Sequence, residues 1–580
     1  MMTISLPNGA RRLCVTLPAR IMKWTSSFLF AVLLGASGFS QSASPAKRAA
    51  IDGTVTKEPG SEPVKKALIE LIAEDQTSGG DYTAISAPDG SFRIEGILPG
   101  RYRLFAERTG YLEFDKHHSH SEGRVLTLGD GQELKSLQID LQAAAVVRGR
   151  VTDEDGDPLP NAQVSVMRQT FSSGHNRLEQ IGSERTNDLG EYRVAGLAPG
   201  NYYVSVNPPP DLKSLIENSG ASSQGRTADK PSMSYQTTYY PGTPDRSEAV
   251  SIQLHPGDEF PVNFSLTPGP TLSVRGAVVN LPPRSTAIIM LQSRDFNTVL
   301  SGADMHKDGS FEIHDVSPGS YTILASIENG PVPMLARQSL QVSGSSVEGV
   351  RLAPQPGGSI RGRLHFENKG SLVRFDPTQV FLALRSADGD DSSLTTFGMG
   401  EGFSHITHVA GDGSFEWDNV PPGNFYLQFI DGSSSSDWYL KSVLASGREV
   451  NESGLMLDGG TVVLDVTVSN NGAMLGGITA NEKGDGLSNA TVVAVPEAKL
   501  RQREDHFFKA VTDQTGRFML RGMPPGEYTV FAWESLDGDS FYDPDFLKSY
   551  EGQGVTMRLG EGDHKSVQVK TIPDKDVAEN

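Results

Sequence analysis

The sequence predicts an all-β protein built as a tandem array of about five small β-sandwich domains. Its 580 residues exceed the size of one hydrophobic core and correspond to several domains of roughly 100–150 residues. The chain contains 62 Gly and 35 Pro with 37% hydrophobic residues, a composition typical of many short strands joined by tight turns. A short motif with fixed internal spacing also recurs five times.

The first 43 residues have the features of a secretory signal peptide. Basic residues precede the short apolar run from Phe28 to Leu34, and small and polar residues follow it. This run is too short to span a bilayer. Met22 is an alternative start, because a leader that begins there has ordinary proportions. We therefore predict a signal peptide over residues 1–43 and a protein that is secreted or held in the periplasm or cell envelope.

Charge and cysteine content exclude several classes of partner and chemistry. The net charge is −20, so the chain repels phosphate backbones, and nucleic acid is excluded as a partner. The single cysteine, Cys14, precedes the apolar run and would leave with the leader. A mature chain without cysteine has no disulfide, no thiol nucleophile and no cysteine-ligated metal. No later segment is apolar enough to span a bilayer, so the mature form is not predicted to be an integral membrane protein.

The repeated motif is an acidic or Gly turn and an aromatic, followed by Pro-Gly and a second aromatic ten positions after the first. Asp-Gly supplies a turn with positive φ, and Pro-Gly supplies the next tight turn. The motif therefore predicts two antiparallel strands joined by a short turn. The five aromatic pairs are Phe92 and Tyr102, Tyr192 and Tyr202, Phe311 and Tyr321, Phe415 and Phe425, and Phe518 and Tyr528.

The strand after each Pro-Gly alternates between apolar and polar residues, as in Tyr102, Leu104 and Ala106. A period of two with one apolar face indicates a half-buried antiparallel strand. With an upstream strand pair and a last amphipathic strand, each copy has about seven strands and predicts a sandwich of two antiparallel sheets. The predicted domains are residues 48–144, 145–269, 270–355, 356–462 and 463–573, the second with a long inserted loop.

The stretch from Gly149 to Tyr202 carries a longer pattern, Gly-x-Val followed by Gly-x-Pro-Leu-x-Asn-Ala-x-Val and the turn motif. This pattern resembles the carboxypeptidase regulatory-like domain, as found in large secreted bacterial proteins. The resemblance implies Greek-key, transthyretin-like (immunoglobulin-like) sandwiches, similar to collagen-adhesin B-type repeats and starch-binding-like domains. The third and fourth copies keep only the turn half of the pattern and are degenerate. Such a fold accompanies enzymes, adhesins and receptors alike, so the resemblance indicates structure more than function.

The sequence shows no catalytic constellation. A metallocarboxypeptidase would need a His-x-x-Glu pair and a distant His around zinc, and none of the 12 His has Glu three positions later. A nucleophile elbow, a phosphate-binding loop and a dinucleotide fingerprint are also absent from the sequence. We therefore predict that the protein is not an enzyme.

Two clusters have residue types that bind metal ions. Three imidazoles, His117, His118 and His120, would hold zinc if their loop curled around it. The Asp153 to Asp157 segment crowds oxygen ligands as calcium loops do, but the closing Glu of an EF-hand is missing. A solvated loop and a hairpin turn are the alternatives, so no cofactor is required, with calcium or zinc as options.

Aromatic residues in predicted loops are candidates for ligand binding, because sugar rings stack on exposed aromatic faces. The alternative is that they pack between domains. The candidates are Tyr235, Tyr239 and Tyr240 after the inserted loop, and Trp533, Phe541, Tyr542 and Phe546 after the fifth repeat.

Two functional hypotheses follow. The first is a non-enzymatic extracytoplasmic binding protein, with carbohydrate as the favoured ligand because of the similarity to starch-binding-like domains and the loop aromatics. The second is a structural stalk or protein-interaction scaffold at the cell surface, favoured by five similar domains without a conspicuous site. A polysaccharide or a surface protein is accordingly the expected partner.

Overall fold

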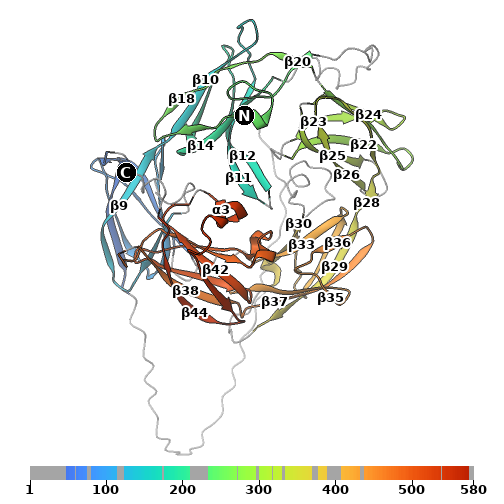
Figure 1. Cartoon of the computed structure of the whole chain (residues 1–580). Helices are drawn as coiled ribbons and strands as arrows, with labels where there is room; N and C mark the ends of the chain where they lie inside the picture. The colour runs from blue at the N-terminus through green and yellow to red at the C-terminus, as the bar shows by residue number, and fades with distance from the viewer. Residues whose placement is uncertain are drawn as a thin grey trace, which may run out of the picture. The chain divides into compact units, whose positions relative to one another are not determined.

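The computed structural model describes residues 47–58, 60–74, 80–113, 123–172, 175–209, 233–270, 272–294, 299–316, 318–328, 334–368, 377–387, 406–431, 437–481, 483–536 and 538–573. These residues form five pairs of facing sheets that follow one another along the chain, from blue to red in Figure 1. Each pair encloses a hydrophobic core of its own, and we call the pairs sandwiches 1 to 5. The predicted all-β sandwich fold is confirmed.

Sandwich 1 defines the pattern of the others. Its first sheet has the order β2 (Glu62–Pro63), β1 (Ala49–Glu58), β9 (Glu133–Ala143) and β7 (Tyr111–Glu113), with β5 (Ser91–Ile97) also paired with β1. Its second sheet has the order β4 (Tyr82–Ile85), β3 (Leu68–Ala73), β6 (Gly100–Glu107) and β8 (Arg124–Leu128).

Sandwich 2 repeats this arrangement and adds a two-stranded ribbon. One sheet contains β13 (Glu191–Leu197), β10 (Ala145–Thr152), β18 (Glu259–Pro261) and β19 (Phe264–Ser265). The other contains β12 (His175–Arg185), β11 (Gln163–Ser172), β14 (Gly200–Asn207), β16 (Thr238–Tyr239) and β17 (Ile252–Leu254). The ribbon pairs β15 (Met233–Tyr235) with β20 (Pro268–Pro270), and a 3-10 turn, η1, covers Arg246–Glu248.

Sandwiches 3 and 4 have the same two-sheet plan. In sandwich 3 the first sheet has the order β24 (Ser310–Val316), β21 (Leu272–Val278) and β27 (Val347–Leu352). The second sheet has the order β23 (Val299–Asp304), β22 (Thr286–Ser293), β25 (Gly319–Glu328), β26 (Met334–Val342) and β28 (Gln355–Pro356). In sandwich 4 the first sheet has the order β32 (Ser414–Val420), β29 (Gly358–Glu367), β37 (Thr461–Ser469), β34 (Tyr439–Ala445) and β35 (Arg448–Glu449). The second sheet has the order β31 (Ile406–His408), β30 (Phe381–Ser386), β33 (Gly423–Ile430) and β36 (Leu455–Leu457). A 3-10 turn, η2, covers Pro377–Gln379.

Among the described residues, sandwich 5 has the fewest strands and most of the helical turns. Its sheets are β41 (Arg517–Met523), β38 (Ala473–Ala480), β44 (His564–Lys570), and β40 (Phe508–Val511), β39 (Thr491–Pro496), β42 (Gly526–Trp533), β43 (Val555–Leu559). The helical turns are η3 (Ala498–Leu500), η4 (Glu504–His506), η5 (Ser540–Tyr542) and α3 (Pro544–Lys548).

The first sheet of every sandwich is mixed, which corrects the prediction of two antiparallel sheets. The first strand of each sandwich pairs in parallel with a late strand, β1 with β9 and β38 with β44 for example. The chain passes to the second sheet and back between these two strands, so that both enter the first sheet from the same end. The strand that follows the Asp-Gly turn pairs antiparallel on the other side of the first strand. It does not pair with the strand after Pro-Gly, which belongs to the second sheet, so the predicted pairing of these two strands is wrong: the Pro-Gly turn carries the chain from one sheet to the other.

A glycine in the first strand explains why the motif begins with Gly-x-Val. A Cβ on this glycine would lie between 1.7 and 2.6 Å from the carbonyl oxygen of the neighbouring parallel strand, closer than any real side chain. Across the antiparallel ladder the same glycine faces the first aromatic of the motif. The pairs are Gly53 with Phe92, Gly149 with Tyr192, Gly276 with Phe311, Gly362 with Phe415 and Gly477 with Phe518.

The turns of the motif have the predicted backbone conformation. The second turn residue has a φ of 78° at Gly90, 73° at Gly190 and 86° at Gly309, a region that favours glycine. The preceding carboxylate accepts the backbone N–H and the hydroxyl of the serine two positions later, as at Asp308 with Ser310. These bonds, that from the Ser310 hydroxyl first, lower the pKa of Asp308 below 3.8.

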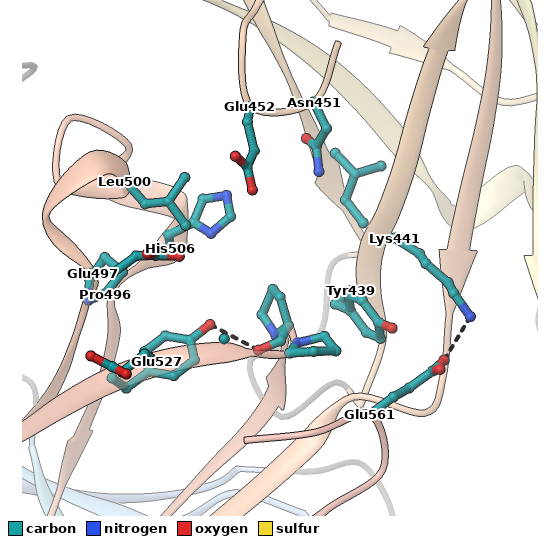
Figure 2. A pocket seen from close by; sticks show the side chains of 15 residues that line it. Tyr439, Lys441, Asn451, Glu452, Pro496, Glu497, Leu500, His506, Glu527 and Glu561 are labelled. Carbon is teal, nitrogen blue, oxygen red and sulfur yellow. Dashed lines mark hydrogen bonds and ion pairs between the residues drawn. The ribbon is translucent and has the colours of Figure 1, made fainter. Parts of the chain in front are cut away.

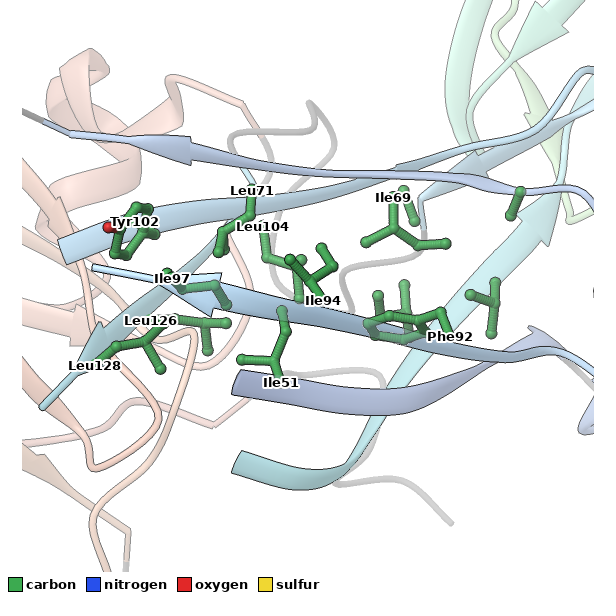
Figure 3. Packing of buried hydrophobic residues seen from close by; sticks show 14 of the residues in the cluster. Ile51, Ile69, Leu71, Phe92, Ile94, Ile97, Tyr102, Leu104, Leu126 and Leu128 are labelled. Atoms are coloured by element: carbon green, nitrogen blue, oxygen red, sulfur yellow. The ribbon is translucent and has the colours of Figure 1, made fainter. Parts of the chain in front are cut away.

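The strand after each Pro-Gly buries its alternate residues. In sandwich 1, Tyr102 and Leu104 are buried between the sheets in the same core cluster as Ile51 and Phe92 of the first sheet, with Tyr102 and Phe92 at opposite ends of it (Figure 3). Burial of each such side chain stabilises the fold by about 1.5–3 kcal/mol relative to exposure. The hydroxyl of Tyr102 donates to the carbonyl of Leu98 at 2.7 Å, so the ring is buried without an unsatisfied polar group.

Candidate functional site

The aromatic cluster that follows the fifth repeat is a second core and not an exposed platform. Trp533 and Phe541 are each 1% exposed, and Tyr542 and Phe546 pack against the same cluster. The cause is local: η5 and α3 fold back over β42, with the side chain of Asp543 capping α3 through the backbone N–H of Asp545. The expectation of exposed rings is therefore corrected for Trp533 and Phe541, while Tyr542 and Phe546 are half-buried.

The tyrosines after the inserted loop are also largely covered. Tyr239 is 6% exposed and packs with Met167 and Leu178, so its ring is not an exposed platform either. Tyr235 and Tyr240 are half-buried against the core of sandwich 2. The hydroxyl of Tyr235 donates to the carboxylate of Glu154 at 2.9 Å, while burial and this contact raise the pKa of Tyr235 to about 12.

The metal-binding candidates give no site in the described part of the chain. His117, His118 and His120 lie outside the described residues. Asp153 accepts the backbone N–H groups of Asp155 and Asp157, which is the hairpin-turn alternative. Among the residues that the structure describes, His, Cys, Asp and Glu form no group of three or more that is arranged to hold a metal ion.

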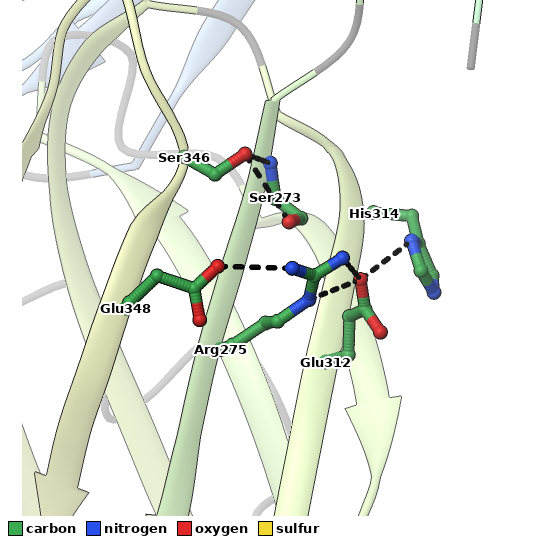
Figure 4. A network of polar contacts seen from close by, with 6 residues as sticks. All are labelled: Ser273, Arg275, Glu312, His314, Ser346 and Glu348. Carbon is green, nitrogen blue, oxygen red and sulfur yellow. Dashed lines mark hydrogen bonds and ion pairs between the residues drawn. The ribbon is translucent and has the colours of Figure 1, made fainter. Parts of the chain in front are cut away.

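A polar network in sandwich 3 is structural. Arg275 on β21 contacts Glu312 on β24 at 2.7 Å and Glu348 on β27 at 2.9 Å, and His314 contacts Glu312 at 3.4 Å (Figure 4). Its hydrogen bond to Glu312 is the main reason that the pKa of Arg275 is raised. The arginine thus joins the first strand to both neighbours, and such exposed cross-strand pairs contribute about 0.2–1 kcal/mol.

A pocket of about 340 Å³ lies where sandwiches 4 and 5 meet, and it is the candidate site (Figure 2). Sandwich 4 supplies the start of β34 and the turn before β36, and sandwich 5 supplies η3, η4 and the Pro-Pro-Gly turn before β42. The residues that line it are Tyr439, Leu440, Lys441, Asn451, Glu452, Pro496, Glu497, Leu500, His506, Pro524, Pro525, Gly526, Glu527, Tyr528 and Glu561.

One side of the pocket is fixed by Lys441. Its ammonium contacts Glu561 of sandwich 5 at 2.8 Å and also Glu367 of its own sandwich. These two hydrogen bonds, that to Glu367 first, raise the pKa of Lys441, so the amine stays protonated. Glu561 in addition accepts the hydroxyl of Ser469 at 3.3 Å. Burial, with the charge of Glu561 second, raises the pKa of Tyr439 to about 12.

The other side is fixed by Arg503, whose side chain is 4% exposed. Its Nε donates to Asp505 at 2.9 Å, its Nη1 donates to the carbonyl of Asn451 in sandwich 4, and the guanidinium lies 4.5 Å from the ring centre of Tyr426. Lys499 reaches Glu452 of sandwich 4 at 3.1 Å. Arg503 thus has partners on both sandwiches: separation would break its bond to the Asn451 carbonyl and its contact with Tyr426, while Asp505 of its own sandwich would stay paired with it.

Two buried polar atoms at the pocket have no hydrogen-bond partner. They are Nδ1 of His506 and Oδ1 of Asn451. His506 is 9% exposed, and burial is the main cause that lowers the pKa of its imidazole below 6.5. His506 is therefore neutral near pH 7, and a neutral imidazole has one nitrogen that accepts a hydrogen bond.

A second contact joins sandwich 5 to the edge of sandwich 1. The side-chain amide of Gln514 accepts the backbone N–H of Thr127 at 3.0 Å and donates to its carbonyl at 2.8 Å. The Thr127 hydroxyl donates to Asp513 at 3.1 Å. Since Thr127 lies in β8 at the end of its sheet, Gln514 satisfies backbone groups that an edge strand leaves unpaired.

Sequence reasoning did not single out Lys441, Asn451, Arg503 or His506. These four residues lie within 65 positions of one another but belong to two sandwiches, and no motif links them. Pro524 and Pro525 line the pocket, but their Pro-Pro-Gly sequence also occurs at residues 421–423 of the fourth repeat, so it does not mark the joint.

Two segments of the chain match a known protein family. Residues 50–142 and 146–209 match the carboxypeptidase regulatory-like domain. Sandwiches 1 and 2 of this tandem β-sandwich chain are thus similar to the carboxypeptidase regulatory-like domain, as the pattern from Gly149 to Tyr202 indicated.

Individual relatives are distant. Colossin-A of Dictyostelium discoideum is 22% identical over 505 residues, which are 80% of this chain and only 4% of that protein. Among solved structures, BcpA, the major pilin subunit of Bacillus cereus, is 9% identical, with 53% of this chain and 99% of that chain covered and a TM-score of 0.15. GBS52, the minor pilin of Streptococcus agalactiae, is 11% identical, with 41% and 100% covered and a TM-score of 0.21. In the described residues no helix is long and apolar enough to cross a membrane.

Proposed function

We propose that the protein is an extracytoplasmic, non-enzymatic scaffold of five β-sandwich domains, with the limits predicted from the repeats, that holds its exposed surfaces in a fixed arrangement. The observation that carries this proposal is the joint between sandwiches 4 and 5. Arg503 is 4% exposed and donates across the joint to the carbonyl of Asn451. In a flexible string of domains Arg503 would keep Asp505 of its own sandwich but would lose the Asn451 carbonyl and the contact with the Tyr426 ring with each bending motion.

The test is a distance measurement across the joint. Cys14 is the single cysteine, so a background with Cys14→Ser accepts spin labels at Val463→Cys in sandwich 4 and Met519→Cys in sandwich 5, both exposed positions. Pulsed electron paramagnetic resonance is expected to give one narrow distance distribution. Arg503→Ala is expected to broaden it, whereas Arg517→Ala, an exposed arginine of the same sandwich, leaves it unchanged. A broad distribution in the unsubstituted joint contradicts the scaffold.

Carbohydrate binding is a second candidate function, favoured by aromatic rings that keep part of their surface exposed. Tyr235 and Tyr240 in sandwich 2, and Tyr542 and Phe546 in sandwich 5, are half-buried rather than buried. A partly exposed tyrosine ring is a surface on which a sugar stacks, while its covered part holds the ring in place. The test is a polysaccharide-binding screen of the purified chain and of its Tyr240→Ala variant. The absence of saturable binding by the unsubstituted chain would exclude the carbohydrate-binding hypothesis and leave the scaffold as the proposed function.

A further inference from the structure

The pocket between sandwiches 4 and 5 is lined by charged groups and hydrogen-bond acceptors that the scaffold function does not require. Its volume of about 340 Å³ lies at the lower end of the range for ligand pockets, which suits one side chain or a small molecule. The joint itself is held by contacts at the edges of this space, through Lys441 on one side and Arg503 on the other. The pocket between these two sets of contacts is therefore large enough to hold a ligand.

The charges around the pocket favour a cation. Four glutamates line it, namely Glu452, Glu497, Glu527 and Glu561. The ammonium of Lys441, the lysine that lines it, is already bonded to two carboxylates. Lys499 contacts Glu452 and Glu497 and offsets part of their charge, but the carboxylate of Glu527 has no partner among the described residues. The interior potential is therefore negative, and an anionic guest is excluded.

The two unpartnered buried atoms call for hydrogen-bond donors. Oδ1 of Asn451 is an acceptor, and Nδ1 of His506 accepts in the tautomer that carries its hydrogen on Nε2. A buried acceptor without a partner costs about 1–3 kcal/mol, which a donor group of a ligand would recover. Figure 2 shows the imidazole of His506 beside Leu500 and below Glu452, and both His506 and Asn451 line the pocket together with the glutamates.

A guanidinium meets these requirements better than an ammonium. It is planar, carries five N–H donors and no acceptor, and is more weakly hydrated than an ammonium. The walls formed by Tyr439, Pro524 and Pro525 would contact the aliphatic stem that carries it, as apolar surfaces do for arginine side chains.

We propose that this pocket binds a guanidinium group, as an arginine side chain of a partner protein or as a free arginine-like molecule. Binding satisfies the buried acceptors of Asn451 and His506 and neutralises Glu527. Because the guest touches both sandwiches, its binding also strengthens the joint.

The test is calorimetric titration of the full chain with three matched probes. N-acetyl-arginine N-methylamide carries the guanidinium, its citrulline counterpart has nearly the same shape without the charge, and the lysine counterpart carries an ammonium. The arginine probe is expected to bind at least tenfold more tightly than the citrulline probe and more tightly than the lysine probe. A peptide with one central arginine separates the two sources, because tighter binding than the amide indicates a protein partner and equal binding indicates a free molecule.

Substitutions place the probe in the pocket. Glu527→Gln keeps the shape of an exposed side chain and is expected to weaken the arginine probe at least threefold. Glu551→Gln, an exposed glutamate of sandwich 5 outside the pocket, is the matched control and leaves binding unchanged. Equal binding of arginine and citrulline probes, saturable binding of a neutral sugar that Glu527→Gln abolishes, or no binding of any probe would each overturn the proposal. None of these results affects the distance test of the scaffold.

Discussion

Replacement of Trp533 by alanine separates a structural from a ligand-binding role of the aromatic cluster. Trp533 is 1% exposed, stacks on Phe531 with ring centres 5.3 Å apart, and meets Tyr550 edge-on at 5.7 Å. Its Nε1 has no hydrogen-bond partner, so the substitution breaks no hydrogen bond and its cost is the lost packing. Removal of such a buried tryptophan costs about 3–5 kcal/mol in the free energy of unfolding.

The chain has several sandwiches, so one global unfolding transition would not isolate this cost. Hydrogen exchange followed by mass spectrometry resolves it in peptides from β42 and β39. A loss of about 3–5 kcal/mol accelerates exchange limited by unfolding by roughly two to three and a half orders of magnitude. Trp417→Ala is the matched control, because Trp417 is 3% exposed in the core of sandwich 4 and its loss accelerates exchange there. Exchange in β42 within threefold of the parent, together with loss of polysaccharide binding, would refute the structural role.

Two further predictions concern the motif glycine and the buried histidine. Gly149→Ala places a Cβ 1.7 Å from the carbonyl oxygen of Val262 and forces β10 away from its parallel partner. It is expected to lower the free energy of unfolding of sandwich 2 by about 3 kcal/mol, as measured by hydrogen exchange, whereas the control Gly476→Ala, whose Cβ has its nearest atom at 3.8 Å, costs under about 1 kcal/mol. The lowered pKa of His506, caused first by burial and opposed by the charges of Asp505 and Glu452, means that the unfolded chain takes up a proton that the folded chain does not. The stability of sandwich 5 is therefore complete above pH 6.5 and falls as the pH drops from 6.5 toward the folded pKa. His506→Phe is expected to flatten this pH dependence when unfolding in urea is followed by hydrogen exchange in peptides of sandwich 5, and an unchanged pH dependence would contradict the prediction.

The sequence by itself determined the repeating unit and its local geometry. The Asp-Gly pairs predicted turns with positive φ, and the structure has 78° at Gly90 and 86° at Gly309. The alternation after Pro-Gly predicted which residues face the core, and Tyr202 and Val204 are buried as expected. These features follow from interactions within about twenty residues, since a turn and a period of two are encoded locally.

Only the tertiary structure decided the rest. The parallel pairing of β1 with β9 joins strands separated by about eighty residues, and no local pattern distinguishes it from an antiparallel edge. The burial of Trp533 depends on η5 and α3 folding back over β42, so aromatics that look like loop residues in sequence become a core. The pocket is assembled from two sandwiches, and only the tertiary structure brings its glutamates together with Asn451 and His506. Local propensity fixes a strand and its faces, whereas the partners of those faces are selected by packing across the whole chain.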